Sequence, residues 1–291
     1  MHVIVYGSKG WIGGQFVDLL KKKNISFVEA FSRADNYEEC QEEIVSNKVT
    51  HVVSFIGRTH GPNFGTIDYL EQSGKLTENL TDNLYAPLVL CDICIKHNIH
   101  YTYMGTGCIF EYDNDHPYGE ETSGFTENDK PNFFGSSYSI VKGFTDRLMH
   151  FYPVLNLRIR MPINGEDCPR NFISKIIRYK KICNIPNSMT VLPDIFPIMI
   201  DMMTKGLVGT YNLTNPGLIS HNTILEMYKK YVDSNFTWEN FSVQEQDKIL
   251  LSKRSNNFLD TSKLQDSYSS LNRIEVSVEN ILKNWNKKLS N

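Results

Sequence analysis

A tyrosine and a lysine four residues apart, Tyr138 and Lys142 in SSYSIVKGF, are the clearest sign of chemistry in the sequence. On a helix, positions i and i+4 share a face, so the lysine ammonium can lie beside the phenol. A neighbouring positive charge favours the phenolate and lowers the tyrosine pKa from its usual value of about 10. Such a tyrosine could exchange a proton near neutral pH, which suits the reversible reduction of a ketone.

A glycine pattern at the start of the chain, VIVYGSKGWIGG, predicts a binding site for a dinucleotide. It lies between an expected strand and an expected helix, where glycines permit a tight turn and the helix N-terminus offers free amides to a pyrophosphate. The alternative is a glycine-rich turn without a ligand. The residues that we expect to contact the cofactor here are Gly7, Ser8, Lys9, Gly10, Trp11, Ile12 and Gly13.

The residues about 20 positions beyond this turn indicate which nicotinamide cofactor is used. An NAD enzyme places an acidic side chain there to hold the ribose hydroxyls. This chain has Ser32 and Arg33 instead. A hydroxyl and a cation suit a 2′-phosphate better than a bare ribose, so we expect NADPH. The alternative is that Arg33 only reaches solvent.

Strands and helices alternate along the first part of the chain, which predicts a doubly wound, Rossmann-like parallel sheet in an α/β fold. The β-branched run in THVVSFIG is typical of a strand buried on both faces. We expect strands at 2–6, 27–31, 52–56, 100–104 and 154–159, and helices at 11–23, 37–46, 81–97 and 135–151.

After Pro162 the elements become shorter and are separated by Pro, Asn and Gly, which indicates a smaller C-terminal substrate-binding lobe. We expect helices at 171–179 and 221–231 there. A helix at 197–205 and a strand at 210–214 could return to the sheet. The expected division is therefore residues 1–164 for the NADP-binding domain, with 197–219 returning to it, and residues 165–291 mainly for the lobe.

Thr106 lies just past the strand expected to end at Met104, at the sheet edge where ligands bind in such folds. Its hydroxyl could join Tyr138 in hydrogen bonding a substrate carbonyl oxygen. The glycine pattern, Thr106 and YxxxK together resemble the short-chain dehydrogenase/reductase superfamily, in its extended branch that modifies nucleotide sugars.

Five longer stretches sharpen this resemblance: GTGCIFEYD, PNFFGSSYSIVKG, RIRMPINGEDCPRNFISKI, NIPNSMTVLPD and LTNPGLISHNTILEMYKKY. They look like the 3,5-epimerase/4-reductases that complete UDP-L-rhamnose synthesis, which occur in plants as half of a fused synthase and in giant viruses as a separate protein. The resemblance covers nearly the whole chain. It implies NADPH as cofactor and UDP-4-keto-6-deoxyglucose as substrate.

The resemblance also assigns catalytic roles. Thr106 and Tyr138 would hold the C4 oxygen of the sugar, stabilising first an enolate and later an alkoxide. Cys108 and Lys175 match the pair that epimerises C3 and C5, although a buried structural thiol and a surface lysine are the alternatives. Cys108 would need a nearby cation or dipole to act as a thiolate. Related dehydratases carry an Asp-Glu pair where this chain has Gly107 and Cys108, so we expect a separate 4,6-dehydratase upstream.

Further contacts are expected near these residues. Trp238 and Phe241 could stack on uracil, but aromatic residues more often belong to a core. Asn83 is expected to support the site mainly through hydrogen bonds. His60 could contact the ligand, and the alternative is a structural role in its loop. The further cofactor contacts expected are Phe55, Ile56, Gly57, Pro162 and Ile163, and the substrate contacts are Arg58, Thr59, His60, Asn83, Arg170, Asn171 and Arg254.

Composition limits the other possible functions. The net charge of −3 and the pI near 6.2 provide no basic field, so we expect no nucleic-acid partner. No apolar run approaches the roughly 20 residues that span a bilayer, and we expect a cytosolic protein. Six scattered cysteines indicate reduced thiols. Cys91 and Cys94 form a lone CxxC that suits core packing better than metal binding, and we expect no metal.

Three alternatives remain for the function. A plain 4-reductase and a dTDP- or GDP-sugar epimerase/reductase would share the glycine pattern and YxxxK, although Cys108 argues against the plain reductase. A non-enzymatic NADP-binding regulatory subunit would be free to lose Tyr138 or Lys142, which this chain retains. A homodimer through the YxxxK helices, common in the superfamily, is the expected assembly.

Overall fold

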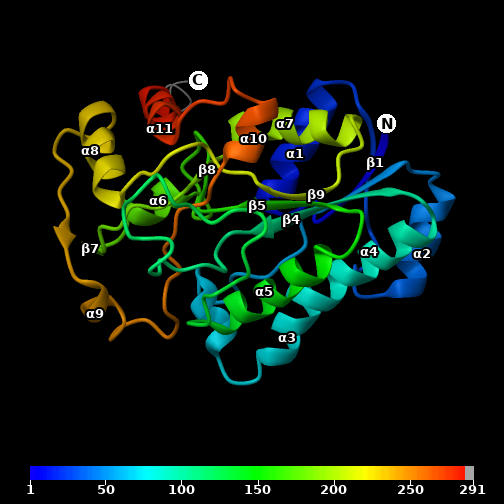
Figure 1. The fold of residues 1–291 in the computed structure, drawn as a ribbon, viewed down its shortest axis with the longest axis horizontal. Helices are drawn as coiled ribbons and strands as arrows, with labels where there is room; N and C mark the ends of the chain where they lie inside the picture. Colours follow the sequence, from blue (N-terminus) through cyan, green and yellow to red (C-terminus); the bar gives the residue numbers. More distant parts are fainter. Residues whose placement is uncertain (286–291) are drawn as a thin grey trace.

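The structure, a computed structural model, describes residues 1–285, and six strands within them form one parallel sheet (Figure 1). Their order is β2-β1-β3-β4-β5-β9, and every neighbouring pair is parallel. The strand order reverses between β1 and β3, and ligands bind at such a switch point, beyond the carboxyl ends of the strands. The strands are β1 His2–Tyr6, β2 Ser26–Glu29, β3 His51–Ser54, β4 His100–Thr106, β5 Leu155–Ile159 and β9 Gly209–Asn212.

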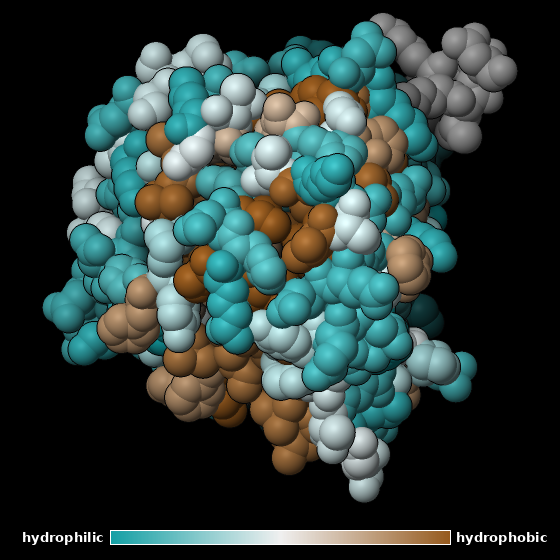
Figure 2. Space-filling view, turned by 90° about the vertical axis from the view of Figure 1, so that its right-hand side faces the viewer, coloured by the Kyte–Doolittle hydropathy of each residue, from teal (hydrophilic) through white to brown (hydrophobic). Residues whose placement is uncertain are grey.

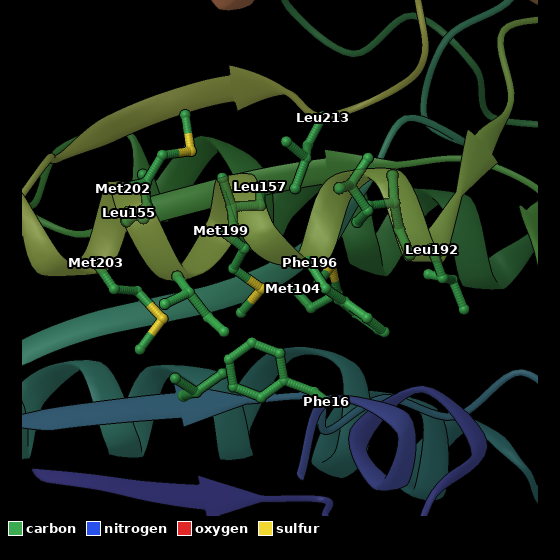
Figure 3. Close-up of a cluster of buried hydrophobic side chains, with 14 of the residues drawn as sticks. Phe16, Met104, Leu155, Leu157, Leu192, Phe196, Met199, Met202, Met203 and Leu213 are labelled. Atoms are coloured by element: carbon green, nitrogen blue, oxygen red, sulfur yellow. The ribbon is translucent and has the colours of Figure 1, made fainter. Parts of the chain in front are cut away.

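Helices cover both faces of the sheet, which confirms the doubly wound prediction. Successive strand residues point to opposite faces: Val3 packs with one group of helices and Ile4 with the other. In Figure 3, Phe16 of α1 lies against α7, and its ring is 5.6 Å from that of Phe196. One face carries α1 Trp11–Lys22, α7 Leu192–Thr204 and α10 Ser262–Ser267, and the other carries α2 Tyr37–Ser46, α4 Ala86–Lys96 and α5 Ser137–Met149.

Several segments of the sheet layer depart from the predicted bounds; the strands expected at 27–31 and 52–56, for example, span Ser26–Glu29 and His51–Ser54. The helix expected at 81–97 is the end of a longer run that begins with α3 Leu76–Leu80 and passes through a π-helical turn, η2 Thr81–Tyr85, before α4. The strand expected to end at Met104 continues to Thr106, because β4 pairs with β5 as far as Thr106 and Ile159. Thr106 is therefore the last residue of the strand.

The helix α7 begins five residues earlier than predicted and continues through Pro197. A proline inside a helix removes one hydrogen bond, so the sequence suggested a start at Pro197. The side chains on either side, including Phe196, Met199 and Ile200, are buried against the sheet, and this packing holds the helix despite the proline. β9 follows and pairs with β5, so this part of the chain does adjoin the sheet.

The C-terminal elements enclose a hydrophobic cluster of their own, the lobe cluster, which includes Ile163, Ile173, Ile224 and Val278. The helix expected at 171–179 spans only Phe172–Ile176, whereas the helix expected at 221–231 has those bounds. The lobe contains β6 Pro162–Ile163, α6 Phe172–Ile176, β7 Lys181–Ile182, β8 Thr190–Val191, α8 His221–Tyr231, β10 Glu239–Asn240, α9 Val243–Gln246 and α11 Ile274–Lys283.

The division at residue 164 stays a prediction, and the separate cluster is compatible with it. Residues 286–291, at the end of the expected lobe, lie outside the described residues. In the described part of the chain, no helix is both long and apolar enough to cross a bilayer.

Candidate active site

A cavity of about 490 Å³ lies at the carboxyl edge of the sheet and is lined both by sheet residues and by the C-terminal lobe. It brings together the glycine turn after β1, Cys108 after β4, Tyr138 on α5 and Lys175 on α6. The residues that the sequence grouped as thiol, phenol and cofactor turn therefore share one cavity.

The glycine turn forms a cradle that side chains would fill. Gly7 has φ +81°, and a Cβ there would lie 3.1 Å from the carbonyl carbon of Phe55 at the end of β3. A Cβ on Gly13 would lie 2.2 Å from the Gly7 oxygen. The N-cap of α1 is Gly10, which has no side chain to occupy the first amides of the helix. These features fit the pyrophosphate of a dinucleotide.

Most of the predicted site residues line this cavity. Those that do are Gly7, Gly10, Trp11, Ile12, Gly13, Phe55, Ile56, Gly57, Thr59, His60, Asn83, Thr106, Cys108, Tyr138, Lys142, Pro162, Arg170, Lys175 and Arg254. Those that are not part of its lining are Ser8, Lys9, Ser32, Arg33, Arg58, Ile163 and Asn171. Lining a cavity is not a demonstrated contact, so the individual roles stay predictions.

The pair expected to choose the cofactor lies beyond β2. The Arg33 guanidinium makes two hydrogen bonds of 3.0 Å to the carboxylate of Asp35, and its side chain is 74% exposed. Ser32 is buried, and its amide donates to Glu43. Arg33 is therefore free to reach a phosphate only by sharing or leaving Asp35.

Tyr138 and Lys142 lie on α5 and are both buried. Burial raises the pKa of Tyr138, a charge on Cys108 raises it further, and a hydrogen bond with Thr106 opposes both effects. The prediction that Lys142 lowers this pKa is wrong for this structure, because the ammonium donates to the hydroxyl of Tyr103 and lies 4.5 Å from the centre of that ring. Burial also lowers the pKa of Lys142 to about 7.

Thr106 and Cys108 form a tight turn at the end of β4. The Cys108 amide donates to the Thr106 hydroxyl at 3.1 Å, and the Gly107 amide donates to the Ile159 carbonyl at 3.0 Å. Because this turn is bonded to β5, the thiol is held beside the phenol of Tyr138, whose pKa responds to a charge on it.

Lys175 lies in a group of cations. Burial, together with the charges of Arg170 and Arg254, lowers the Lys175 pKa to about 8. Arg170 donates to Nδ1 of His60 at 2.6 Å, so His60 accepts through that nitrogen, and burial and the neighbouring cations lower the His60 pKa to about 4. This end of the cavity suits an anion, and a lysine with this pKa can transfer protons near neutral pH.

The other two arginines predicted to contact the substrate, Arg254 and Arg58, have carboxylate partners. Arg254 pairs with Asp68 at 2.7 Å, joining the 3₁₀ turn η1 Ile67–Glu71 to the C-terminal part of the chain. Burial alone would raise the Asp68 pKa, but hydrogen bonds from Arg254 and Ser252 lower it to about 2. Arg58 pairs with Asp82 at 2.8 Å and Glu78 at 3.2 Å, which explains its absence from the lining.

Two amides predicted near the substrate have structural partners. Asn171 is fully buried and caps α6 by accepting from the amide of Ile173, while its own amide group donates to Asn164 and Glu166. Its predicted substrate contact is therefore replaced by a capping role. Asn83, in the π-helical turn η2, exchanges hydrogen bonds with the backbone of Arg58 and lines the cavity, consistent with a supporting role. π-Helical turns often occur at functional sites.

Trp238, considered for stacking on uracil, donates to Asn222 and packs within the lobe cluster. Its ring stacks on that of Phe236, with the ring centres 6.0 Å apart. Neither Trp238 nor Phe241 is part of the cavity lining. Trp238 is therefore better described as part of the hydrophobic core than as a contact for uracil.

Sequence reasoning missed two buried groups beside the predicted catalytic residues, Tyr103 and Arg160. Tyr103 accepts the hydrogen bond of Lys142. Arg160 follows β5 and is 1% exposed. The alternation in RIRM was a usable signal, because an arginine at the end of a buried parallel strand must find internal partners.

The six cysteines are all free, and burial raises the pKa values of both Cys91 and Cys94 on α4. Among residues 1–285, no group of three or more His, Cys, Asp or Glu side chains is arranged to hold a metal ion.

Comparison with known proteins identifies relatives over nearly the full length. No protein-family model matches the chain. It is 54% identical to the solved structure of the L780 UDP-rhamnose synthase from Acanthamoeba polyphaga mimivirus, with a TM-score of 0.94 and coverage of 97% of this chain and 99% of that one. It is 43% identical to a bifunctional dTDP-4-dehydrorhamnose 3,5-epimerase/dTDP-4-dehydrorhamnose reductase of Arabidopsis thaliana, covering 99% of this chain and 94% of that protein.

The chain belongs to the family of nucleotide-sugar 3,5-epimerase/4-keto-reductases. A longer member is a trifunctional UDP-glucose 4,6-dehydratase/UDP-4-keto-6-deoxy-D-glucose 3,5-epimerase/UDP-4-keto-L-rhamnose-reductase of Arabidopsis thaliana, 42% identical over 99% of this chain but only 42% of that protein. Family membership confirms the resemblance drawn from the motifs.

Proposed function

We propose that the protein converts UDP-4-keto-6-deoxyglucose to UDP-L-rhamnose, by epimerising C3 and C5 and then reducing the C4 ketone with NADPH. The observation that carries this proposal is the common cavity of Cys108, Tyr138, Lys175 and the glycine turn. A plain reductase would not need a thiol and a lysine with a pKa near 8 in the same cavity.

The epimerisation uses the acidity of carbons next to the ketone. Cys108 removes the proton from C3 or C5 as a thiolate, and Lys175 delivers a proton to the other face of the ring. Thr106 and Tyr138 hydrogen bond the C4 oxygen and stabilise the enolate formed in between. The two groups belong to different parts of the fold, since Cys108 follows β4 of the sheet and Lys175 belongs to α6 in the lobe. This difference supports their action on opposite faces of the sugar ring.

The reduction uses the same oxygen contacts. NADPH, when bound at the glycine turn, supplies the hydride for C4. Tyr138 donates its phenolic proton to the oxygen that becomes a hydroxyl, and a raised pKa keeps that proton on the phenol until it is needed. Lys142, with a pKa near 7, can return a proton toward this part of the site near neutral pH.

The substrate's charged half fits the cationic end of the cavity. Arg170, Lys175 and Arg254 line that end, and the pKa of Lys175 is lowered by both arginines. A pyrophosphate would relieve this repulsion and accept bidentate hydrogen bonds from the guanidinium groups.

The direct test is to incubate the purified protein with UDP-4-keto-6-deoxyglucose and NADPH in deuterium oxide and to identify the product by NMR. We expect UDP-L-rhamnose with deuterium at C3 and C5. Cys108→Ser should remove the deuterium while still allowing reduction of an already epimerised ketone. Equal deuterium in the wild type and in Cys108→Ser would contradict the role of the thiol.

The nucleobase is a separate question, because one relative is named for a dTDP sugar and another for UDP-rhamnose. We favour UDP because of the higher identity to the UDP-rhamnose synthase. Competition between UDP-, dTDP- and GDP-linked 4-keto sugars in one mixture tests this choice, and a preference for dTDP would reverse it.

The 4-keto substrate requires a 4,6-dehydratase, and we infer that a different active site forms it, because this chain carries Gly107 and Cys108 where related dehydratases carry an Asp-Glu pair. The chain aligns with 42% of the trifunctional relative, whose name includes the dehydratase activity. We also place the reaction in the cytoplasm, where thiols stay reduced, in keeping with six free cysteines.

We further propose a homodimer through the helices α3 to α5. Apolar side chains are exposed there, including Leu76 at 62%, Phe144 at 60% and Phe151 at 73%. Figure 2 shows apolar surface along the lower part of the molecule, where Figure 1 places α3 and α5. Light scattering of the wild type and of Phe144→Asp tests the proposal. We expect a dimer and a monomer, respectively, and a monomeric wild type would refute it.

A further inference from the structure

Arg160 is a buried cation without a carboxylate partner in residues 1–285. Its side chain is 1% exposed, yet its hydrogen bonds go to neutral acceptors: Oδ1 of Asn187 and the carbonyl of Ser255 at 2.9 Å, and the Gly107 carbonyl at 3.5 Å. Its Nε has no partner among the described residues. Arg158, two residues earlier and equally buried, has the expected ion pair, with Asp146 at 2.7 Å.

A buried charge without a counter-charge is strongly destabilising, so an anion near Arg160 would have a clear physical effect. Burial lowers the pKa of Arg160, and among the described residues a charge on Cys108 or on Tyr112 would oppose this effect. The Tyr112 phenol donates to the carbonyl of Pro186 at 2.9 Å, and burial raises its pKa, so this phenol stays neutral. Cys108 is therefore the candidate counter-charge, and Lys142 and Tyr138 of α5 are the other titratable groups that interact with it.

The backbone holds these two residues together. Arg160 packs on Gly107, the residue before Cys108, and a Cβ at Gly107 would lie 3.0 Å from Cγ and 3.1 Å from Cδ of the arginine. The Gly107 carbonyl also accepts from Asn257 at 3.0 Å. Because Gly107 has no side chain, the turn that carries the thiol can lie directly on the arginine.

We propose that Arg160 is a positioning residue for epimerisation, whose buried positive charge stabilises the thiolate of Cys108. The proposal rests on the proposed function for its purpose, but the effect of the charge on the thiol can be tested without turnover. Arg160 touches neither substrate nor cofactor in this role. It acts through Cys108.

The test is alkylation of Cys108 by iodoacetamide between pH 5 and 10, followed by peptide mass spectrometry. Only the thiolate reacts, so the midpoint of the rate against pH reports its formation. Arg160→Gln should raise the midpoint by at least about one pH unit, which slows alkylation about tenfold at a pH well below both midpoints, whereas Arg160→Lys should keep the midpoint closer to that of the wild type. A folded Arg160→Gln with the wild-type midpoint would overturn the proposal.

Two controls separate charge from general packing. Cys168, a partly exposed thiol in the same digest, should keep its profile in every variant. The double variant Asp146→Leu with Arg158→Met removes a buried arginine together with its own carboxylate. Because Asp146 also raises the pKa of Lys142, which interacts with Cys108, this variant should move the Cys108 midpoint, but by much less than Arg160→Gln does. A shift as large as that of Arg160→Gln in this double variant would show that loosened packing is the cause.

A second measurement needs no change at Arg160, in case Arg160→Gln does not fold. If the folded state stabilises the thiolate, the wild type should gain stability over Cys108→Ser as the pH rises toward about 8.5, where the unfolded thiol titrates. That gain should be lost as the pH falls through the midpoint of the alkylation curve. A difference in unfolding free energy that is constant between pH 6 and 9 would overturn the proposal.

The activity assays distinguish this proposal from the proposed function. With Arg160→Gln, we expect slower deuterium incorporation at neutral pH, recovery at higher pH and unchanged reduction of an already epimerised ketone. If the wild type makes no UDP-L-rhamnose but the alkylation midpoint shifts as described, the proposed function fails and the role of Arg160 stands.

Discussion

The protonation of Lys175 should set the upper pH limit of epimerisation. Its pKa of about 8 results from burial and from the charges of Arg170 and Arg254. As a proton donor it must carry its ammonium, which falls from about 90% at pH 7 to about 10% at pH 9. The epimerisation rate should therefore drop about tenfold over this range. A lysine with the ordinary pKa of about 10.4 would still be more than about 95% charged at pH 9.

The assay is solvent deuterium incorporation into UDP-4-keto-6-deoxyglucose without NADPH, measured as kcat/KM between pH 6 and 10. This ratio reports the pKa values of the free enzyme, before the substrate pyrophosphate can alter them. Arg170→Met removes one source of repulsion, so it should move the falling limb to higher pH. Lys175→Met should lose most of the incorporation. Lys175→Arg is the charge-matched control, and any residual rate should lack a fall near pH 8.

Two results would refute this reasoning. One is a wild-type profile that stays flat to pH 9.5. The other is a rate that rises through pH 8 without a later fall by pH 9.5, because loss of the Lys175 ammonium would then not limit the reaction. A falling limb that persists unchanged in Lys175→Arg would assign it to a different group.

Further substitutions test the other parts of the molecule. Tyr138→Phe should slow reduction about 100-fold or more, measured by NADPH oxidation, while deuterium incorporation falls less. Arg33→Ala should raise KM for NADPH about tenfold and leave KM for NADH nearly unchanged, the effect being limited because Arg33 must leave Asp35 to bind a phosphate. Asp146→Asn should lower the unfolding free energy by roughly 3–5 kcal/mol, since it leaves Arg158 buried and unpaired, whereas Asp146→Leu with Arg158→Met should cost much less in urea denaturation.

The sequence predicted the layers of the fold because these depend on local periodicity and on the glycine turn. It placed α2 and α8 at their bounds and put Tyr138 on a helix with Lys142. It missed the start of α7, since the packing that holds Pro197 in a helix comes from sheet residues distant in sequence.

The site was harder to predict where burial and long-range partners decide the outcome. Residue spacing suggested a lowered pKa for Tyr138, but burial raises this pKa. Lys142, on the same helix, instead donates a hydrogen bond to Tyr103 of strand β4. Arg58 was predicted as a substrate contact, and its pairing with Asp82 depends on how the helix after β3 turns back. Such tertiary partners leave little trace in a single sequence.

The ion pair between Arg254 and Asp68 links two segments 186 positions apart in the chain. If Arg254 binds a substrate phosphate, as proposed, that phosphate must compete with the Asp68 carboxylate for the same guanidinium, and each binding event would exchange one anion for another. Such an exchange would lower the affinity for the nucleotide, and it would let the Arg254–Asp68 ion pair form again as the product leaves.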